Sequence, residues 1–180
     1  MLANLLKLLQ YYKGLGESTF EQLEEEELFL EPADGSNSIS VIVKHLWGNM
    51  TSRWTNFLTE DGEKSWRDRD AEFESSITSR VELMEKWDQG WKVFLNAIKE
   101  LKNEDLEKTV YIRNEGHTVI DAIHRQVAHY SYHIGQIVYL GKIIKGEDWD
   151  CLSIPRNKSE DYNRKKFAIE VGQRYFTDDL

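Results

Sequence analysis

The sequence predicts an all-α fold, a bundle of four long helices with long connections and a short extra C-terminal helix. Three observations lead to this prediction. Apolar residues recur at helical spacing in four long segments, about residues 2–28, 37–58, 76–101 and 118–145. Only two prolines occur, Pro32 and Pro155, and both fall where a helical pattern stops. No alternation of period two is long enough to indicate a strand of ordinary length.

The first helix is expected over residues 2–28. Gly14 and Gly16 either bend it or let another helix approach closely. The acidic run Glu24–Glu27 is expected to be a solvated helix end. The inner face is marked by large apolar residues at helical spacing: Leu2, Leu5, Leu6, Leu9, Tyr12, Phe20 and Leu23.

The second helix is expected to begin near Asn37 or Ser38, since both are good N-cap residues, and to end near Leu58. Its apolar stripe consists of Ile39, Ile42, Val43, Leu46, Met50, Trp54 and Phe57. The third helix is expected over residues 76–101. Its stripe consists of Ile77, Val81, Met84, Trp87, Trp91, Phe94, Leu95, Ile98 and Leu101.

Two long connections separate the last three of these helices. Long ordered loops in compact domains are often functional, and we expect Trp66 and Phe73 to pin the loop 59–74 to the helices. In the second connection, residues 109–112 have the composition of a brief extended segment, and residues 114–116 read as a turn.

The fourth helix is expected from Thr118 to Lys145, with Thr118 and Asp121 resembling a capping box and Gly146 at its C-terminal end. Its buried stripe consists of Ile120, Ile123, Val127, Tyr130, Ile134, Ile137, Val138, Gly141 and Ile144. A loop over residues 146–159 and a short helix over about 160–171 follow. We expect that last helix to pack over one end of the bundle.

Length and composition bound the class of protein. A chain of 180 residues is enough for a single domain, expected over 1–180. Its net charge of −9 makes nucleic acids and anionic membranes poor partners. Cys151 is the only cysteine, which excludes an internal disulfide and a cysteine-based zinc site. The sequence shows neither a signal peptide nor an apolar run of membrane-spanning length, so a cytoplasmic protein is expected.

Three histidines form the strongest chemical signal. His129 and His133 lie four residues apart on one helix, which places both imidazoles on one face, one turn apart. His45 lies at the edge of the stripe of the second helix and supplies a possible third ligand. Three neutral imidazoles leave a fourth position open for water or substrate, as in a catalytic metal site. Zinc or nickel suits such ligands best, and cobalt and iron are alternatives.

The alternative interpretation is that these histidines lie at the edge of a core, each satisfied by a hydrogen bond. Asn49 and Gln126 are expected to lie beside the site and to orient a ligand or substrate. His117 precedes the fourth helix and His124 projects away from His129, so neither is an expected ligand.

Short motifs in the same order along the chain carry a resemblance to a known family. They are Ser38-Ile39 at a helix start, Val43-Lys44-His45-Leu46, and His129-Tyr130-Ser131-Tyr132-His133-Ile134-Gly135-Gln136. With these motifs the chain resembles the DinB-like superfamily over most of its length. Two further segments resemble a branch of that superfamily without an assigned function: Asp61-Gly62-Glu63-Lys64 with Trp66–Asp70, and Ser153–Arg156.

The resemblance implies a DinB-like four-helix bundle that holds a divalent metal on three histidines and is often dimeric. Characterised relatives include bacillithiol- and mycothiol-dependent S-transferases and isomerases, in which the metal activates a low-molecular-weight thiol. No definite thiol-cofactor pocket is evident in the sequence, although Arg53, Arg125 and Arg156 are candidates to hold an acidic thiol.

Two functional hypotheses follow. The first is a metal-dependent thiol S-transferase acting in detoxification or stress response on a small-molecule substrate. The second is a non-catalytic module that binds a metal or a small molecule. A serine hydrolase is not supported because no G-x-S-x-G motif occurs, and Cys151 has no histidine nearby in sequence.

A homodimer is also expected. The first and third helices carry more apolar side chains than one inward stripe requires, and such an excess marks a partner interface. The residues concerned include Leu8, Tyr11, Trp87 and Phe94.

Overall fold

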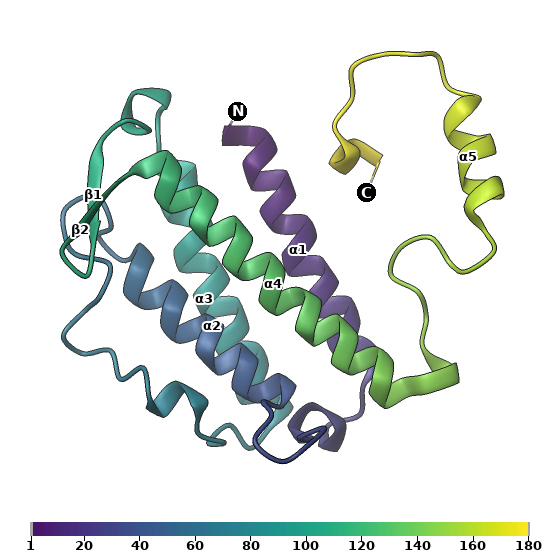
Figure 1. Ribbon diagram of the computed structural model, residues 1–180, viewed down its shortest axis with the longest axis horizontal. Helices are drawn as coiled ribbons and strands as arrows, with labels where there is room; N and C mark the ends of the chain where they lie inside the picture. The colour runs from purple at the N-terminus through teal and green to yellow at the C-terminus, as the bar shows by residue number, and fades with distance from the viewer. Residues whose placement is uncertain (1, 180) are drawn as a thin grey trace.

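Four long helices form the body of the protein, as the sequence predicts (Figure 1). The computed structural model describes residues 2–179. Helix α1 packs against α4 and α3, and α2 packs against α3 and α4. The bounds of the five α-helices are α1 Leu2–Gln22, α2 Ile39–Trp54, α3 Arg80–Glu100, α4 Val119–Lys145 and α5 Ser159–Phe167.

The helix starts follow from their capping side chains. The hydroxyls of Ser38, Ser79 and Thr118 each accept a hydrogen bond from a backbone N–H in the first turn of α2, α3 and α4. Three helix ends were predicted too late along the chain, including that of α5, which ends at Phe167 and not near residue 171. Helix α1 ends at Gln22 and a 3₁₀ turn follows at Glu26–Phe29. Helix α2 ends at Trp54, because Asn56 adopts a left-handed conformation with φ 52°.

Aromatic side chains fill the centre of the bundle. Trp87, Trp91 and Phe94 of α3 are buried, and Phe20 of α1 packs edge-on against Trp87 with ring centroids 5.0 Å apart. A Cβ atom at Gly16 would lie 2.6 Å from the Trp87 ring. Gly16 therefore allows α1 and α3 to approach closely. The expectation that Trp87 and Phe94 form a partner surface is wrong, because the core covers both.

The two long connections hold each other. Strands β1 (Thr109–Ile112) and β2 (Glu115–Thr118) form an antiparallel hairpin whose turn residues, Arg113 and Asn114, both have positive φ. The carboxylate of Asp61, from the loop 59–74, accepts hydrogen bonds from the backbone N–H groups of both turn residues at 2.8 Å. This places the loop 59–74 beside the hairpin and along α2, while Trp66, expected to pin it, is 61% exposed.

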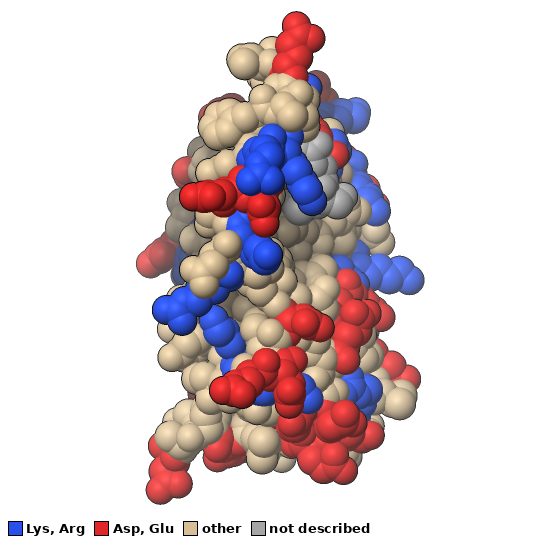
Figure 2. All heavy atoms as spheres, turned by 90° about the vertical axis from the view of Figure 1, so that its right-hand side faces the viewer, with Lys and Arg blue, Asp and Glu red and all other residues tan. Residues whose placement is uncertain are grey.

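Helix α5 lies apart from the other helices (Figure 1), and the chain then returns to α1 at the 3₁₀ turn Phe176–Asp179. Helix α5 buries none of its residues, so its expected packing over the bundle is wrong. Lys7 of α1 contacts the 3₁₀ turn through an ion pair with Asp178 at 2.6 Å. On the face that carries the C-terminal segment, acidic side chains gather in the lower half and basic ones are scattered above them (Figure 2). No described helix is both long and apolar enough to cross a membrane.

Candidate metal centre

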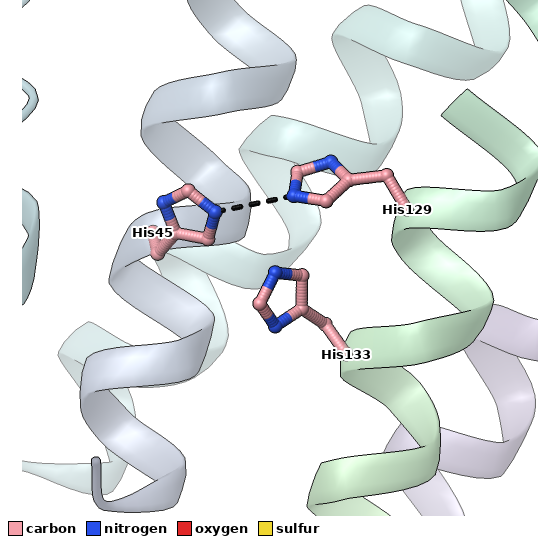
Figure 3. A group of neighbouring side chains, drawn as sticks. All are labelled: His45, His129 and His133. Atoms are coloured by element: carbon pink, nitrogen blue, oxygen red, sulfur yellow. Dashed lines mark hydrogen bonds between the residues drawn. The ribbon is translucent and has the colours of Figure 1, made fainter. Parts of the chain in front are cut away.

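The three predicted histidines lie together between α2 and α4 (Figure 3). Each has a ring nitrogen within 4.8 Å of the others. The Nε2 atoms of His45 and His129 are 3.2 Å apart, close to the spacing of about 3.3 Å between two nitrogens on one tetrahedral zinc ion. His45 is buried, and His129 and His133 are half-buried. The arrangement has the size of a metal site.

A carboxylate from the loop 59–74 holds His45. Nδ1 of His45 lies 2.9 Å from Glu72 Oε2, and Arg67 donates to both oxygens of Glu72 at 2.7 and 3.0 Å. Burial opposes ionisation of Glu72, but the hydrogen bonds from His45 and Arg67 outweigh it and lower the pKa of this carboxyl. Phe73 stacks on the His45 ring at 4.8 Å. His45 is thus fixed with Nε2 directed at the other histidines, as a carboxylate fixes histidine ligands in metal sites.

The close approach of Glu72 to α2 depends on Gly48, which lies three residues after His45 on that helix. A Cβ atom at Gly48 would lie 2.3 Å from Glu72 Oε1. The absence of a side chain there gives the buried carboxylate its place against the helix.

Hydrogen bonds to the remaining two imidazoles differ. His133 lies 2.7 Å from Gln136 Oε1, so its Nδ1 carries the proton and its Nε2 is an acceptor. His129 Nδ1 instead accepts from Gln126 Nε2 at 2.9 Å, so its proton lies on Nε2, directed at His45. For His129 to bind a metal through Nε2 as a neutral imidazole, its proton would have to move to Nδ1, and the Gln126 amide would have to turn its oxygen toward Nδ1 to accept it.

Both half-buried histidines favour the neutral form. Burial, with the charges of His133, His45, Arg53 and Arg67, lowers the pKa of His129 to about 3. Burial also lowers the pKa of His133. Neutral imidazole is the form that binds metals, so the site is prepared for a cation at neutral pH.

Asn49 and Gln126 occupy different places. Asn49 lines the cavity at the histidines. Gln126 is fully buried and lies behind His129, where its amide also donates to Asn49 Oδ1 at 3.0 Å. Tyr130 donates its hydroxyl to the same oxygen at 3.2 Å. Both amides are thus placed to orient His129 or a ligand.

The cavity above the histidines has a volume of about 350 Å³, within the range of small-molecule sites. Its lining includes two of the three arginines singled out in the sequence, Arg53 and Arg125, and does not include Arg156. The full lining is His45, Asn49, Arg53, Arg67, Arg69, Phe73, Arg113, Arg125, His129 and His133. These described lining residues include no carboxylate and no hydroxyl, thiol or amine side chain.

A model of the family DUF1572, described as a protein of unknown function, matches residues 1–158. The chain belongs to this family. The DUF1572 match spans α1 to α4 with all three histidines and ends just before α5. Neither the comparison with curated proteins nor the comparison with solved structures gives a significant match.

Glu72, Arg67 and Gly48 are the residues of this DUF1572 site that the sequence did not reveal. Glu72 and Arg67 lie in an irregular loop, where no periodicity relates them to His45. The available signal was the unusual length of the loop 59–74 together with its alternating acidic and basic residues. Gly48 lies within a helix, where a glycine is unfavourable; a close contact is one reason for such a glycine, but Gly135 of α4 has none, so the sequence alone did not distinguish the two.

Cys151 does not belong to the site. It is exposed, and its sulfur lies 3.7 Å from Ser153 Oγ. His124 is exposed on α4, and His117 lies in β2, away from the three clustered histidines.

Proposed function

We propose that this protein is a divalent-metal-binding protein of the DinB-like superfamily that acts as a thiol-dependent S-transferase. The observation that carries the metal proposal is the convergence of three imidazoles on one point, with His45 held by a buried carboxylate. Zinc or nickel suits this all-nitrogen donor set. The family match and the order of helices agree with the superfamily resemblance but leave it a proposal.

The residues present fit such a metal. His45, His129 and His133 would hold it, with Glu72 and Gln136 orienting two of the rings. When bound, a divalent metal acts as a Lewis acid that lowers the pKa of a thiol or water at its open position. The described lining residues include no carboxylate, hydroxyl, thiol or amine, so the nucleophile of the proposed reaction would be a thiol or water at the open position of the metal. A low-molecular-weight thiol of the bacillithiol type meets that requirement.

Metal content tests the first part of the proposal. Untagged protein, prepared under metal-replete conditions, is expected to contain about one metal per chain by elemental analysis, because tags add histidines of their own. His45→Ala is expected to lose most of it. His124→Ala is the matched control, since His124 is exposed on the same helix as two of the ligands. Metal-free wild-type protein, or full occupancy in His45→Ala, contradicts the proposal.

Thiol transfer tests the second part. Metal-loaded protein is incubated with bacillithiol and monochlorobimane, and conjugate formation is followed by fluorescence. The expected result is turnover that His129→Ala abolishes and His124→Ala retains. The reacting thiol loses its proton, its sulfur forms the new bond to the electrophile, and chloride leaves.

A non-catalytic module is the second candidate, and one observation favours it. Glu72, the buried carboxylate nearest the histidines, is already bound by His45 and Arg67 and is poorly placed to move protons. This candidate predicts metal binding with no turnover across a broad panel of thiols and electrophiles.

Assembly as a homodimer is part of the proposal. Support comes from the outer face of α4, where Tyr132, Tyr139 and Ile143 are 64%, 65% and 52% exposed. Exposed apolar stripes of this kind mark interfaces, and two-fold pairing is the commonest arrangement. Light scattering at micromolar concentration is expected to give twice 21.2 kDa; the monomer mass contradicts the dimer.

A further inference from the structure

The cavity over the histidines is rich in arginine although the chain as a whole is acidic. Five arginines line it, namely Arg53, Arg67, Arg69, Arg113 and Arg125, in a chain of net charge −9. The face shown in Figure 2 carries both signs of charge, with acidic groups gathered in its lower half. Because the chain as a whole is acidic, the arginines of the cavity are a local concentration of positive charge.

Two of these arginines already have acidic partners. Arg67 is paired with Glu72 and Glu63, and Arg113 lies 3.3 Å from Glu63. Arg53, Arg69 and Arg125 form no ion pair with any residue of the described range 2–179. Arg69 lies over the ring of Phe73. Because exposed arginines such as Arg69 and Arg125 are common on surfaces, the informative residue is Arg53.

Arg53 is a buried cation without an anion. It is 8% exposed, and its Nη1 donates to Gln126 Oε1 at 3.2 Å. Its Nε is buried and has no hydrogen-bond partner among the described residues. Burial, together with the charges of Arg125 and Arg67, lowers the pKa of the guanidinium. Charged side chains are almost never buried without a partner, so an anionic group from outside the chain would complete this arrangement.

Gln126 connects Arg53 to the histidines. Its oxygen accepts from Arg53 and its nitrogen donates to His129. When His129 offers Nε2 to a metal, Gln126 must turn its oxygen to His129 Nδ1, and Arg53 then loses its acceptor. The state in which the three histidines bind a metal is thus also the state in which Arg53 most needs an oxyanion.

We propose that the cavity binds a small organic anion, and that Arg53 receives its carboxylate or phosphate group beside the three histidines. Arginine suits this role because its planar fork matches both oxyanions with two parallel hydrogen bonds. Arg125 adds a second positive charge at the mouth, where it is exposed. The proposal names the ligand class of the function proposed above and rests on that function for the chemistry at the other end of the ligand.

The test uses full-length, metal-free protein, because a bound metal attracts anions by itself. Metal is removed with a chelating resin, since soluble polycarboxylate chelators resemble the proposed ligand. Inorganic phosphate and succinate are titrated separately by calorimetry at constant ionic strength, which distinguishes a phosphate ligand from a carboxylate ligand. At least one is expected to bind, and Arg53→Gln is expected to weaken binding about tenfold or more, as for the loss of a charged hydrogen-bond partner.

Arg156→Gln is the matched control, because Arg156 is exposed and lies outside the cavity; its affinity should equal that of the wild type. If circular dichroism shows that Arg53→Gln is unfolded, Arg53→Lys decides, since it keeps the charge and removes the fork. For whichever anion binds the wild type, an affinity of Arg53→Lys at least fivefold lower then supports the proposal. Equal affinity in the folded Arg53 variant, or no binding of either anion to wild type, overturns it.

The anion proposal and the metal proposal are contradicted by different binding results. Wild-type protein that binds metal and neither anion overturns only the anion proposal. Protein that binds an anion through Arg53 and takes up no metal overturns the three-histidine site and leaves the anion site standing.

Discussion

The two sides of α4 at residues 129 and 130 show how one helix serves two purposes. Tyr130 faces the core, where it is 1% exposed, packs on Phe94 and Trp91, and receives a hydrogen bond from Trp54. His129, its neighbour in sequence, faces the cavity and is held by polar contacts to Gln126 and His45. The core side is ordered by packing and the cavity side by hydrogen bonds. Stability and binding should therefore respond to different substitutions on the same helix.

The largest expected effect separates the core side of α4 from the histidine site between α2 and α4. Ile134→Ala removes a buried core side chain and should reduce the free energy of unfolding by about 2–5 kcal/mol, while the folded variant keeps its metal. His45→Ala should do the reverse, losing metal with a small change in melting temperature. Melting and metal content are measured on both variants, each metal-free and metal-loaded.

Equal loss of metal and of stability in Ile134→Ala and His45→Ala would contradict this separation. It would mean that the histidine site and the core form one cooperative unit.

The next effect concerns the approach of the loop to α2. Gly48→Ala places a Cβ atom 2.3 Å from the present position of Glu72 Oε1, so the flexible end of Glu72 must shift, which disturbs its contact with His45. Loss of such an orienting carboxylate weakens metal affinity about 10–100-fold. The measurement is a competition titration with a chromogenic chelator.

Gly135→Ala is the control for Gly48→Ala. It lies on α4, and a Cβ atom there meets nothing within 4 Å. Its metal affinity should be unchanged; an equal loss in both variants would assign the effect to helix substitution in general.

A smaller effect is expected from pH in the metal-free protein. The pKa of His129 is about 3 in the folded chain and about 6.5 when unfolded. Below about pH 6.5 the unfolded chain binds a proton that the folded chain does not, so stability falls as the pH falls toward 3. His129→Gln should flatten this dependence of the melting temperature between about pH 6.5 and pH 4. An unchanged slope in that variant would mean that His129 is not the group responsible.

The smallest effect is expected from removing residues 159–180. Helix α5 buries no residue, and the ion pair of Lys7 with Asp178 joins partly exposed groups, which contribute little. A chain ending at residue 158 should keep its metal content, and its free energy of unfolding should change by less than about 0.5 kcal/mol. A marked loss of either would show that the segment contributes to the helical body.

The sequence predicted those parts that a periodic pattern records. The stripes of α2 and α4 located His45, His129 and His133 at matching edges, because helical spacing fixes which side chains share a face. Thr118 was predicted as an N-cap, and Ser38 as one of two candidates with Asn37, for the same local reason. The extended residues 109–112 were also predicted, although their pairing with β2 was not.

The remaining features depend on contacts between distant segments. Glu72 reaches His45 across 27 positions, and no local pattern records that pairing. The burial of Trp87 under α1 depends on the close approach that Gly16 allows. A count of apolar residues on α3 does not include this contact, and it therefore wrongly predicted that Trp87 lies at an interface with another chain. Helix α2 ends early because the backbone of Asn56 is left-handed. The apolar pattern continues to Phe57, so the sequence predicted a longer helix. Arg53 was noticed as a charge, but its lack of an acidic partner is visible only in three dimensions.

The loop 59–74 has a consequence for the timing of metal uptake. Its Glu72 and Phe73 both contact His45, and Lys44 of α2 donates to the backbone of Glu74 at 3.1 Å. The loop contacts the proposed metal-binding residue His45 through two of its side chains, and the hydrogen bond from Lys44 holds the loop closed over it. We expect the rates of metal entry and escape to follow the opening of this segment, so that the lifetime of the complex can be tuned at Lys44 while the three histidines remain unchanged.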